Sequence, residues 1–154
     1  MVVKSVVHFE IPASDVENLS KFYSDVFGWK FEKVPAGEMD YWMISTGPQN
    51  KSVGGGMYKK NGPDDGPRNF IAVDEIDGAI ASFTTAGGKE IMGKQEVPGM
   101  GWTYIGVDPE GNKVGLWQAT PSRPAASRRS SSSRRTARKS ARTTTATRRR
   151  KSKS

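Results

Sequence analysis

His8 and Glu10 are the two residues of this sequence whose types and spacing could carry out acid–base chemistry. They alternate with apolar residues in the run 7–11, which predicts a strand with both side chains on one face. A carboxyl group beside an imidazole can serve as acid and base if burial raises its pKa. The alternatives are a hydrogen-bonded strand histidine without chemistry and a solvated carboxylate at the sheet rim. Because the chain has no cysteine, thiol catalysis and thiolate metal sites are excluded.

The elements that must position this pair follow a βαβββ order. The capping-box pattern 14–17 opens a helix whose apolar residues recur at helical spacing until Gly28, a typical C-cap. Strands are expected at 7–11, 29–34, 41–46 and 53–58.

The same order is expected again after the turn-rich linker 61–67. Asp74 is a possible N-cap for a shorter helix with an apolar stripe over 76–83, ended by Gly87 and Gly88. The other elements are strands at 69–73, 89–92, 102–107 and 113–118.

The repeat is also visible in the residues themselves, because 37–48 can be laid against 98–109. Two βαβββ units can join their sheets into a curved wall with the helices outside and a concave face inside. The sequence therefore predicts an α+β fold made of two modules, at about 3–60 and 68–118, in a domain spanning 1–120.

A second region, 121–154, differs sharply in charge. The first 120 residues hold 16 Asp/Glu and 11 Lys/Arg, a net charge of −5, whereas the last 34 hold 13 Lys/Arg and no acid. Such a composition cannot bury enough apolar surface to order itself, which predicts a disordered tail. The tail resembles the Ser/Ala/Lys/Arg-rich tails of histone-like proteins.

Paired and clustered arginines in this tail are candidates for binding polyanions such as nucleic acid without reading sequence. The candidates are Arg128, Arg129, Arg134, Arg135, Arg148, Arg149 and Arg150. With no aromatic residue in the tail, stacking on bases is excluded. The alternative is a solvated tail that aids solubility or contacts any polyanion, including the acidic domain of the same chain.

The N-terminus lacks the long apolar centre of a signal peptide, and no segment approaches the roughly 18 apolar residues of a membrane span. We therefore expect a cytoplasmic protein without a membrane partner. A nucleoid-associated protein is the alternative location.

The duplicated pattern resembles the vicinal oxygen chelate superfamily, which includes glyoxalase I, extradiol dioxygenases and bleomycin resistance proteins. The resemblance covers about residues 3–118 and is carried by these segments: 8–11 with Asp15, 22–29, 70–73 with Asp77, and 108–112.

The resemblance implies a place for a divalent metal, held by one side chain from each of four strands. Those positions fall on His8, Gly55, Phe70 and Gly115, of which His8 alone offers a ligand atom. Glu10 could add a second ligand, but a catalytic ion requires about two or three protein ligands. We therefore expect no metal and no cofactor.

Strand alternation predicts which side chains line the concave face. His8 and Glu10 are its polar groups, and its expected ligand-binding walls are Tyr41, Met43, Met57, Phe70, Trp102, Tyr104 and Trp117. The assignment of the wall strands is open, because Trp42 and Ile44 could equally face inward. The same aromatic residues could instead be core or a dimer contact.

The sequence is compatible with three functions. The first is a metal-independent protein that binds a small organic molecule, as the resemblance implies for bleomycin resistance proteins. The second is a lyase, isomerase or hydrolase that uses His8 and Glu10, with or without a divalent metal. The third is a nucleoid-associated protein that binds DNA through its tail. A homodimer is expected, with the modules paired within one chain or swapped between two.

Overall fold

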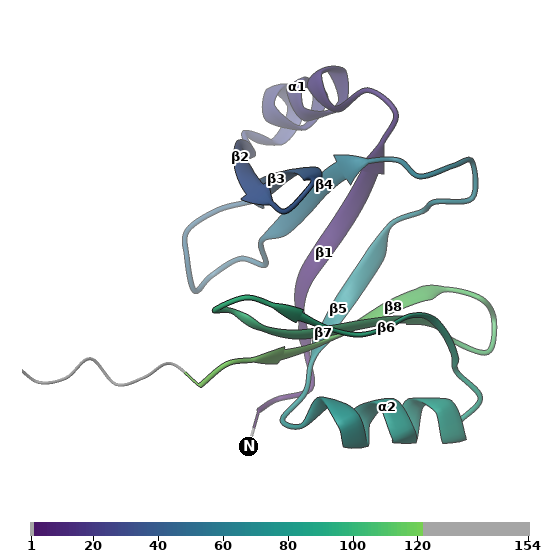
Figure 1. Ribbon diagram of the computed structural model, residues 1–154. Helices are drawn as coiled ribbons and strands as arrows, with labels where there is room; N and C mark the ends of the chain where they lie inside the picture. Colours follow the sequence, from purple (N-terminus) through teal and green to yellow (C-terminus); the bar gives the residue numbers. More distant parts are fainter. Residues whose placement is uncertain (1, 122–154) are drawn as a thin grey trace, which may run out of the picture. The chain divides into compact units, whose positions relative to one another are not determined.

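The computed structural model describes residues 2–121 (Figure 1). These residues include both predicted modules. The tail predicted at 121–154, with its seven candidate arginines, lies outside the described residues except for Pro121.

The predicted duplication is confirmed, since each half follows the order βαβββ. The first half contains β1 (Val6–Ala13), α1 (Val16–Phe27), β2 (Lys30–Ala36), β3 (Met39–Ser45) and β4 (Gly55–Lys59). The second half contains β5 (Arg68–Ala72), α2 (Ile76–Thr85), β6 (Lys89–Val97), β7 (Gly101–Val107) and β8 (Lys113–Ala119).

Helix α1 begins at Val16, one residue later than it would if Ser14 were the N-cap, as the capping-box pattern predicted. Asp15 is the N-cap, and its Oδ1 accepts a hydrogen bond of 3.0 Å from the backbone N–H of Asn18. Gly28 ends the helix in the left-handed conformation at φ 68°, as predicted. This turn places Trp29 against the helix, where its ring stacks on that of Tyr23 at 4.9 Å.

Helix α2 likewise begins one residue after the expected cap. Glu75, not Asp74, is the N-cap, because its carboxylate accepts hydrogen bonds from the N–H groups of Asp77 and Gly78 at 2.8 and 2.7 Å. A longer carboxylate reaches two free donors of the first turn at once.

All eight strands form one sheet in the order β2-β3-β4-β1-β5-β8-β7-β6. The first and last strands of each half pair in parallel, β1 with β4 and β5 with β8. The two halves join at the centre through the antiparallel pair of β1 and β5. Within this single chain, the two modules therefore complete one sheet together.

Both helices cover the same face of this sheet, near its two ends (Figure 1). Under α1, a core of Ala13, Ile44 and Met57 packs with partly buried neighbours that include Phe9 and Ile11. Under α2, the core residues are Val73, Ile76, Tyr104 and Leu116. The curved two-module sheet with helices on one side confirms the predicted fold.

We call the opposite face, which neither helix covers, the open face. The register of β1 with β5 pairs His8 with Phe70 and Glu10 with Arg68, so all four side chains meet at its centre. Neither helix in residues 2–121 is long and apolar enough to cross a membrane.

Candidate functional site

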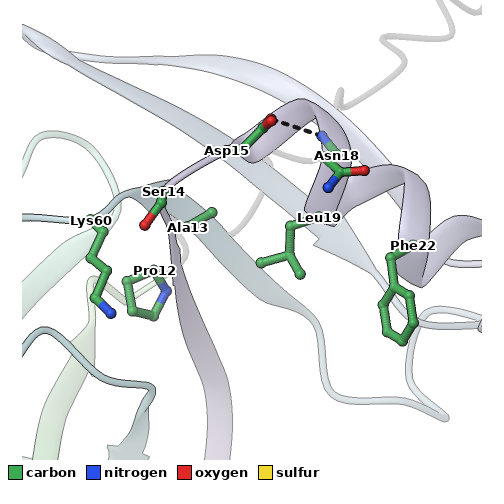
Figure 2. Close-up of a pocket in the computed structure, with 8 residues that line it drawn as sticks. All are labelled: Pro12, Ala13, Ser14, Asp15, Asn18, Leu19, Phe22 and Lys60. Carbon is green, nitrogen blue, oxygen red and sulfur yellow. Dashed lines mark hydrogen bonds between the residues drawn. The ribbon is translucent and has the colours of Figure 1, made fainter. Parts of the chain in front are cut away.

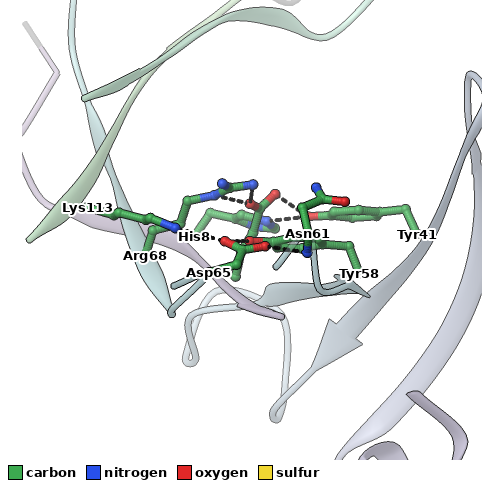
Figure 3. Close-up of polar contacts among 8 residues, drawn as sticks. His8, Tyr41, Tyr58, Asn61, Asp65, Arg68 and Lys113 are labelled. Atoms are coloured by element: carbon green, nitrogen blue, oxygen red, sulfur yellow. Dashed lines mark hydrogen bonds and ion pairs between the residues drawn. The ribbon is translucent and has the colours of Figure 1, made fainter. Parts of the chain in front are cut away.

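A chain of hydrogen bonds links four side chains on the open face (Figure 3). His8 Nε2 lies 2.8 Å from the hydroxyl oxygen of Tyr41, and that hydroxyl donates to Glu10 Oε1 at 3.0 Å. The Nε and Nη2 groups of Arg68 both lie 2.5 Å from Glu10 Oε2. We refer to His8, Tyr41, Glu10 and Arg68 as the relay.

The charges of the relay are sheltered from water. Glu10 is 8% exposed, and the Arg68 guanidinium lies over the ring of Tyr58, 4.8 Å from its centroid. Burial lowers the pKa of His8, an effect that Arg68 reinforces and the Glu10 carboxylate opposes. Burial, together with the Glu10 charge and hydrogen bond, raises the pKa of Tyr41 above its ordinary range. Near neutral pH, both His8 and Tyr41 are therefore uncharged.

A second group of polar contacts adjoins the relay at the linker between the modules (Figure 3). Asp65 accepts hydrogen bonds from the Tyr58 hydroxyl at 2.9 Å, Lys113 Nζ at 2.8 Å and the Asn61 N–H at 3.1 Å. Burial alone would raise the pKa of Asp65, but these donors outweigh it and lower that pKa. The linker is thus fixed to β4 and β8 beside Arg68.

Two glycines of the open face leave room for aromatic rings. A Cβ atom at Gly56 would overlap the hydroxyl end of Tyr41, and one at Gly115 would overlap the ring of Phe70. The rings therefore occupy the space of the missing side chains. Gly55, assigned above to the metal-ligand position of the fourth strand, faces the other way, because its Cβ would meet the ring of Phe9 on the helix-covered side.

The residues at this place do not fit the divalent metal of the related enzymes. Phe70 and Gly115 offer no ligand atom, and both oxygens of Glu10 already accept hydrogen bonds from Tyr41 and Arg68. Within residues 2–121, no group of three or more His, Asp or Glu side chains is placed to hold an ion.

Four of the seven predicted wall residues lie on the open face. They are Tyr41, Met43, Phe70 and Trp117. Tyr41 belongs to the relay, and Phe70 of β5 pairs with Gly115 of β8. Met43 pairs with Gly56, and Trp117 pairs with Ala72, two residues after Phe70 on β5. Whether these residues bind a ligand stays a prediction.

The expected orientation of the other three wall residues was wrong. Met57 is fully buried under α1, and Tyr104 is fully buried under α2 with Trp102 packed beside it. The register explains this, because Tyr104 pairs with Leu116 and paired residues share a face. The open-face residues of β7 are instead Thr103 and Ile105.

Arg68 and Tyr58 are site residues that the sequence analysis missed. Arg68 lies two residues before Phe70, so strand alternation could have placed it on the same face. Tyr58 belongs to the open face because it pairs with Tyr41, a contact between strands that alternation within one strand does not show.

Among the cavities on the described residues, two are of similar size. One, of about 420 Å³, lies at the N-terminus of α1 between Pro12, Leu19, Phe22 and Lys60 (Figure 2), and no relay residue lines it. The other, of about 390 Å³, borders the relay; its lining includes Arg68, Lys113, Ile91 and Ile105. The linker residues 61–65 form the rest of the lining of this second cavity, which therefore joins two isoleucines to the polar groups of the linker, Arg68 and Lys113.

Comparisons with known proteins agree with this fold. Residues 5–47 match the family profile described as "Bleomycin resistance protein-like N-terminal". A glyoxylase-like domain-containing protein of Didymella fabae is 38% identical over 89 residues, which cover 53% of this chain and 67% of the relative. "Putative glyoxylase CFP32" of Mycobacterium bovis is 29% identical over 115 residues, 71% of this chain, and the match spans only 44% of that relative's length.

A solved structure shares the fold at low sequence identity. A methylmalonyl-CoA epimerase of Streptomyces coelicolor superposes with a TM-score of 0.59 and 11% identity, covering 78% of this chain and 97% of the epimerase. The paired βαβββ modules, their central β1–β5 junction and the 38% identical relative lead to one conclusion: the chain belongs to the vicinal oxygen chelate superfamily.

Proposed function

We propose that this protein binds a small organic molecule on its open face without a metal ion. The observation that carries the proposal is that aromatic rings stand on the open face where related metalloenzymes have metal-ligating side chains. Tyr41 and Phe70 fill the space left by Gly56 and Gly115, so the centre of the open face is an aromatic surface around a buried ion pair. Apolar walls with a few fixed polar groups are typical of small-molecule sites.

The cavity of about 390 Å³ gives such a molecule a place beside the relay. Ile105 is 4% exposed and forms its floor, whereas Ile91 is 53% exposed at its edge. Arg68 and Lys113 add the polar groups, and each is held in place by a carboxylate.

The match to a bleomycin resistance protein-like profile supports binding, whereas relatives named as glyoxylases and an epimerase support the alternative, an enzyme that uses His8 and Glu10. The contacts of Glu10 count against that alternative, because a substrate would have to compete with Arg68 at Oε2 and with the Tyr41 hydroxyl at Oε1. Metal-dependent turnover that is lost in a folded His8→Ala variant would favour the enzyme.

The proposal is tested by native mass spectrometry of gently purified protein, followed by titration of any organic molecule recovered. Ile91→Glu places a charge at the cavity edge and should abolish binding, while Val26→Glu changes an equally exposed apolar residue on α1 and should not. One divalent ion per chain, or equal binding by both variants, would contradict the proposal.

Two partners also remain proposals. We propose a homodimer, which sedimentation at several protein concentrations would detect as a doubled mass. We also propose that the segment 121–154 contacts nucleic acid or another polyanion through its arginines, without reading sequence.

A further inference from the structure

The direction of the relay's hydrogen bonds can be worked out from Tyr41, whose hydroxyl has one hydrogen and two neighbours. Glu10 Oε1 lies 3.0 Å away and His8 Nε2 lies 2.8 Å away. Two nitrogens of Arg68 contact the other oxygen of Glu10, so this side chain is half of an ion pair. A charged acceptor attracts the hydrogen more strongly than a neutral imidazole does, so the hydroxyl donates to Glu10.

The hydroxyl oxygen then presents its lone pairs to His8. If Nε2 carried no hydrogen, two lone pairs would face each other across 2.8 Å, so Nε2 must be the donor. A neutral imidazole has one N–H group, which leaves Nδ1 as an acceptor. Burial, with help from Arg68, lowers the pKa of His8, which favours this neutral form.

Nδ1 of His8 is accessible for a further bond. Among residues 2–121, no hydrogen bond reaches this atom. The side-chain polar atoms buried there without a partner are Thr103 Oγ1 and Tyr104 Oη, so Nδ1 keeps contact with solvent. A lone pair in this position is available to a ligand.

The surroundings of His8 indicate the chemistry of that ligand. The ring of Phe70 meets the imidazole edge to face, with centroids 5.6 Å apart. Glu10 is paired with Arg68, and Asp65 is paired with Lys113, so the nearest buried charges already have partners. A neutral aromatic molecule is therefore favoured over an ion.

We propose that Tyr41 is a positioning residue that holds His8 in its Nε2–H form, and that His8 Nδ1 accepts a hydrogen bond from a neutral aromatic ligand bearing a hydroxyl or ring N–H group. The ligand half of this proposal rests on the proposed binding function. The tautomer half concerns the free protein and can be tested without any ligand.

The tautomer is measured by long-range ¹H–¹⁵N NMR of the full chain at pH 7.5, where the single histidine leaves no ambiguity of assignment. We expect Nε2 to resonate as a protonated nitrogen and Nδ1 as an unprotonated one. Tyr41→Phe should move both resonances toward the shifts of a free histidine, which are averaged over its two exchanging neutral tautomers. Tyr23→Phe on α1 should leave both resonances unchanged. The reverse assignment in the wild-type protein, or an unaltered spectrum in a folded Tyr41→Phe variant, would overturn this half.

The ligand class is tested with phenol and anisole, which share a ring but differ in the donor. Phenol should shift the Nδ1 resonance of His8 saturably, and anisole at equal concentration should leave it in place. Equal shifts from both probes, or no saturable shift with phenol, would overturn the ligand class. An organic ligand found elsewhere on the protein would overturn the proposed function while leaving the tautomer result intact.

Discussion

Replacing Glu10 with glutamine removes the charge of a buried ion pair while keeping the size of the side chain. The side chains of Glu10 and Arg68 are 10% and 16% exposed, so water can do little to stabilise the guanidinium left behind. Removing one partner of a buried pair typically costs about 3–5 kcal/mol of unfolding free energy. Because the amide oxygen can still accept one hydrogen bond, we expect a loss near the lower end, about 3 kcal/mol.

The assay is urea unfolding, with the free energy extrapolated linearly to water. Lys21→Met is the control, because it breaks an ion pair whose side chains are 72% and 61% exposed and should cost only about 0.3–0.5 kcal/mol. The double variant Glu10→Gln, Arg68→Met removes both buried charges and should cost clearly less than the sum of its single changes.

Two results would refute this reasoning. A loss for Glu10→Gln below about 1 kcal/mol, similar to that of a surface pair, would mean that water screens the relay. Additive losses in the double variant would mean that Glu10 and Arg68 do not stabilise each other. There would then be no basis for Tyr41 donating to a charged Glu10.

The caps, the histidine and the tail lead to three further predictions. Asp15→Ala should lower the unfolding free energy by about 1 kcal/mol and Ser14→Ala by much less, since Asp15 alone caps α1; equal losses in urea unfolding would contradict this. Because folding lowers the pKa of His8, the unfolded chain takes up the proton first, and the unfolding free energy should fall as the pH drops below about 6.5. The loss should end once the pH is below the folded pKa. Urea unfolding from about pH 7.5 to 5.5 should show this slope, and His8→Gln should remove it. DNA affinity should weaken linearly in log–log form with added salt and disappear when residues 121–154 are deleted; fluorescence anisotropy that shows binding by residues 1–120 would count against the tail.

Local sequence patterns were sufficient to predict the elements and their duplication. Apolar residues at helical spacing, a glycine after α1 and alternating strands act through neighbours in the chain, so they are visible without a fold. The caps were each misplaced by one residue, because several adjacent polar residues at Ser14–Asp15 and Asp74–Glu75 could accept the same backbone hydrogen bonds.

The facing of β7 could not be predicted in the same way. Trp102, Tyr104 and Ile105 put large apolar residues on both sides of the strand, so alternation does not distinguish the core face from the open face. The pairing of Tyr104 with Leu116 decides it, and that pairing depends on the register between β7 and β8.

The sequence by itself determined that glycine and phenylalanine stand where the metalloenzymes of the superfamily need ligands, because residue identity alone decides whether a side chain has a donor atom. The tertiary structure decided what stands there instead. Tyr41 reaches His8 and Glu10 from β3, and Arg68 reaches Glu10 from β5, separations of 31 and 58 residues for the two contacts to Glu10. Such contacts arise only when the strands pair, and so the order of the relay is a property of the folded sheet.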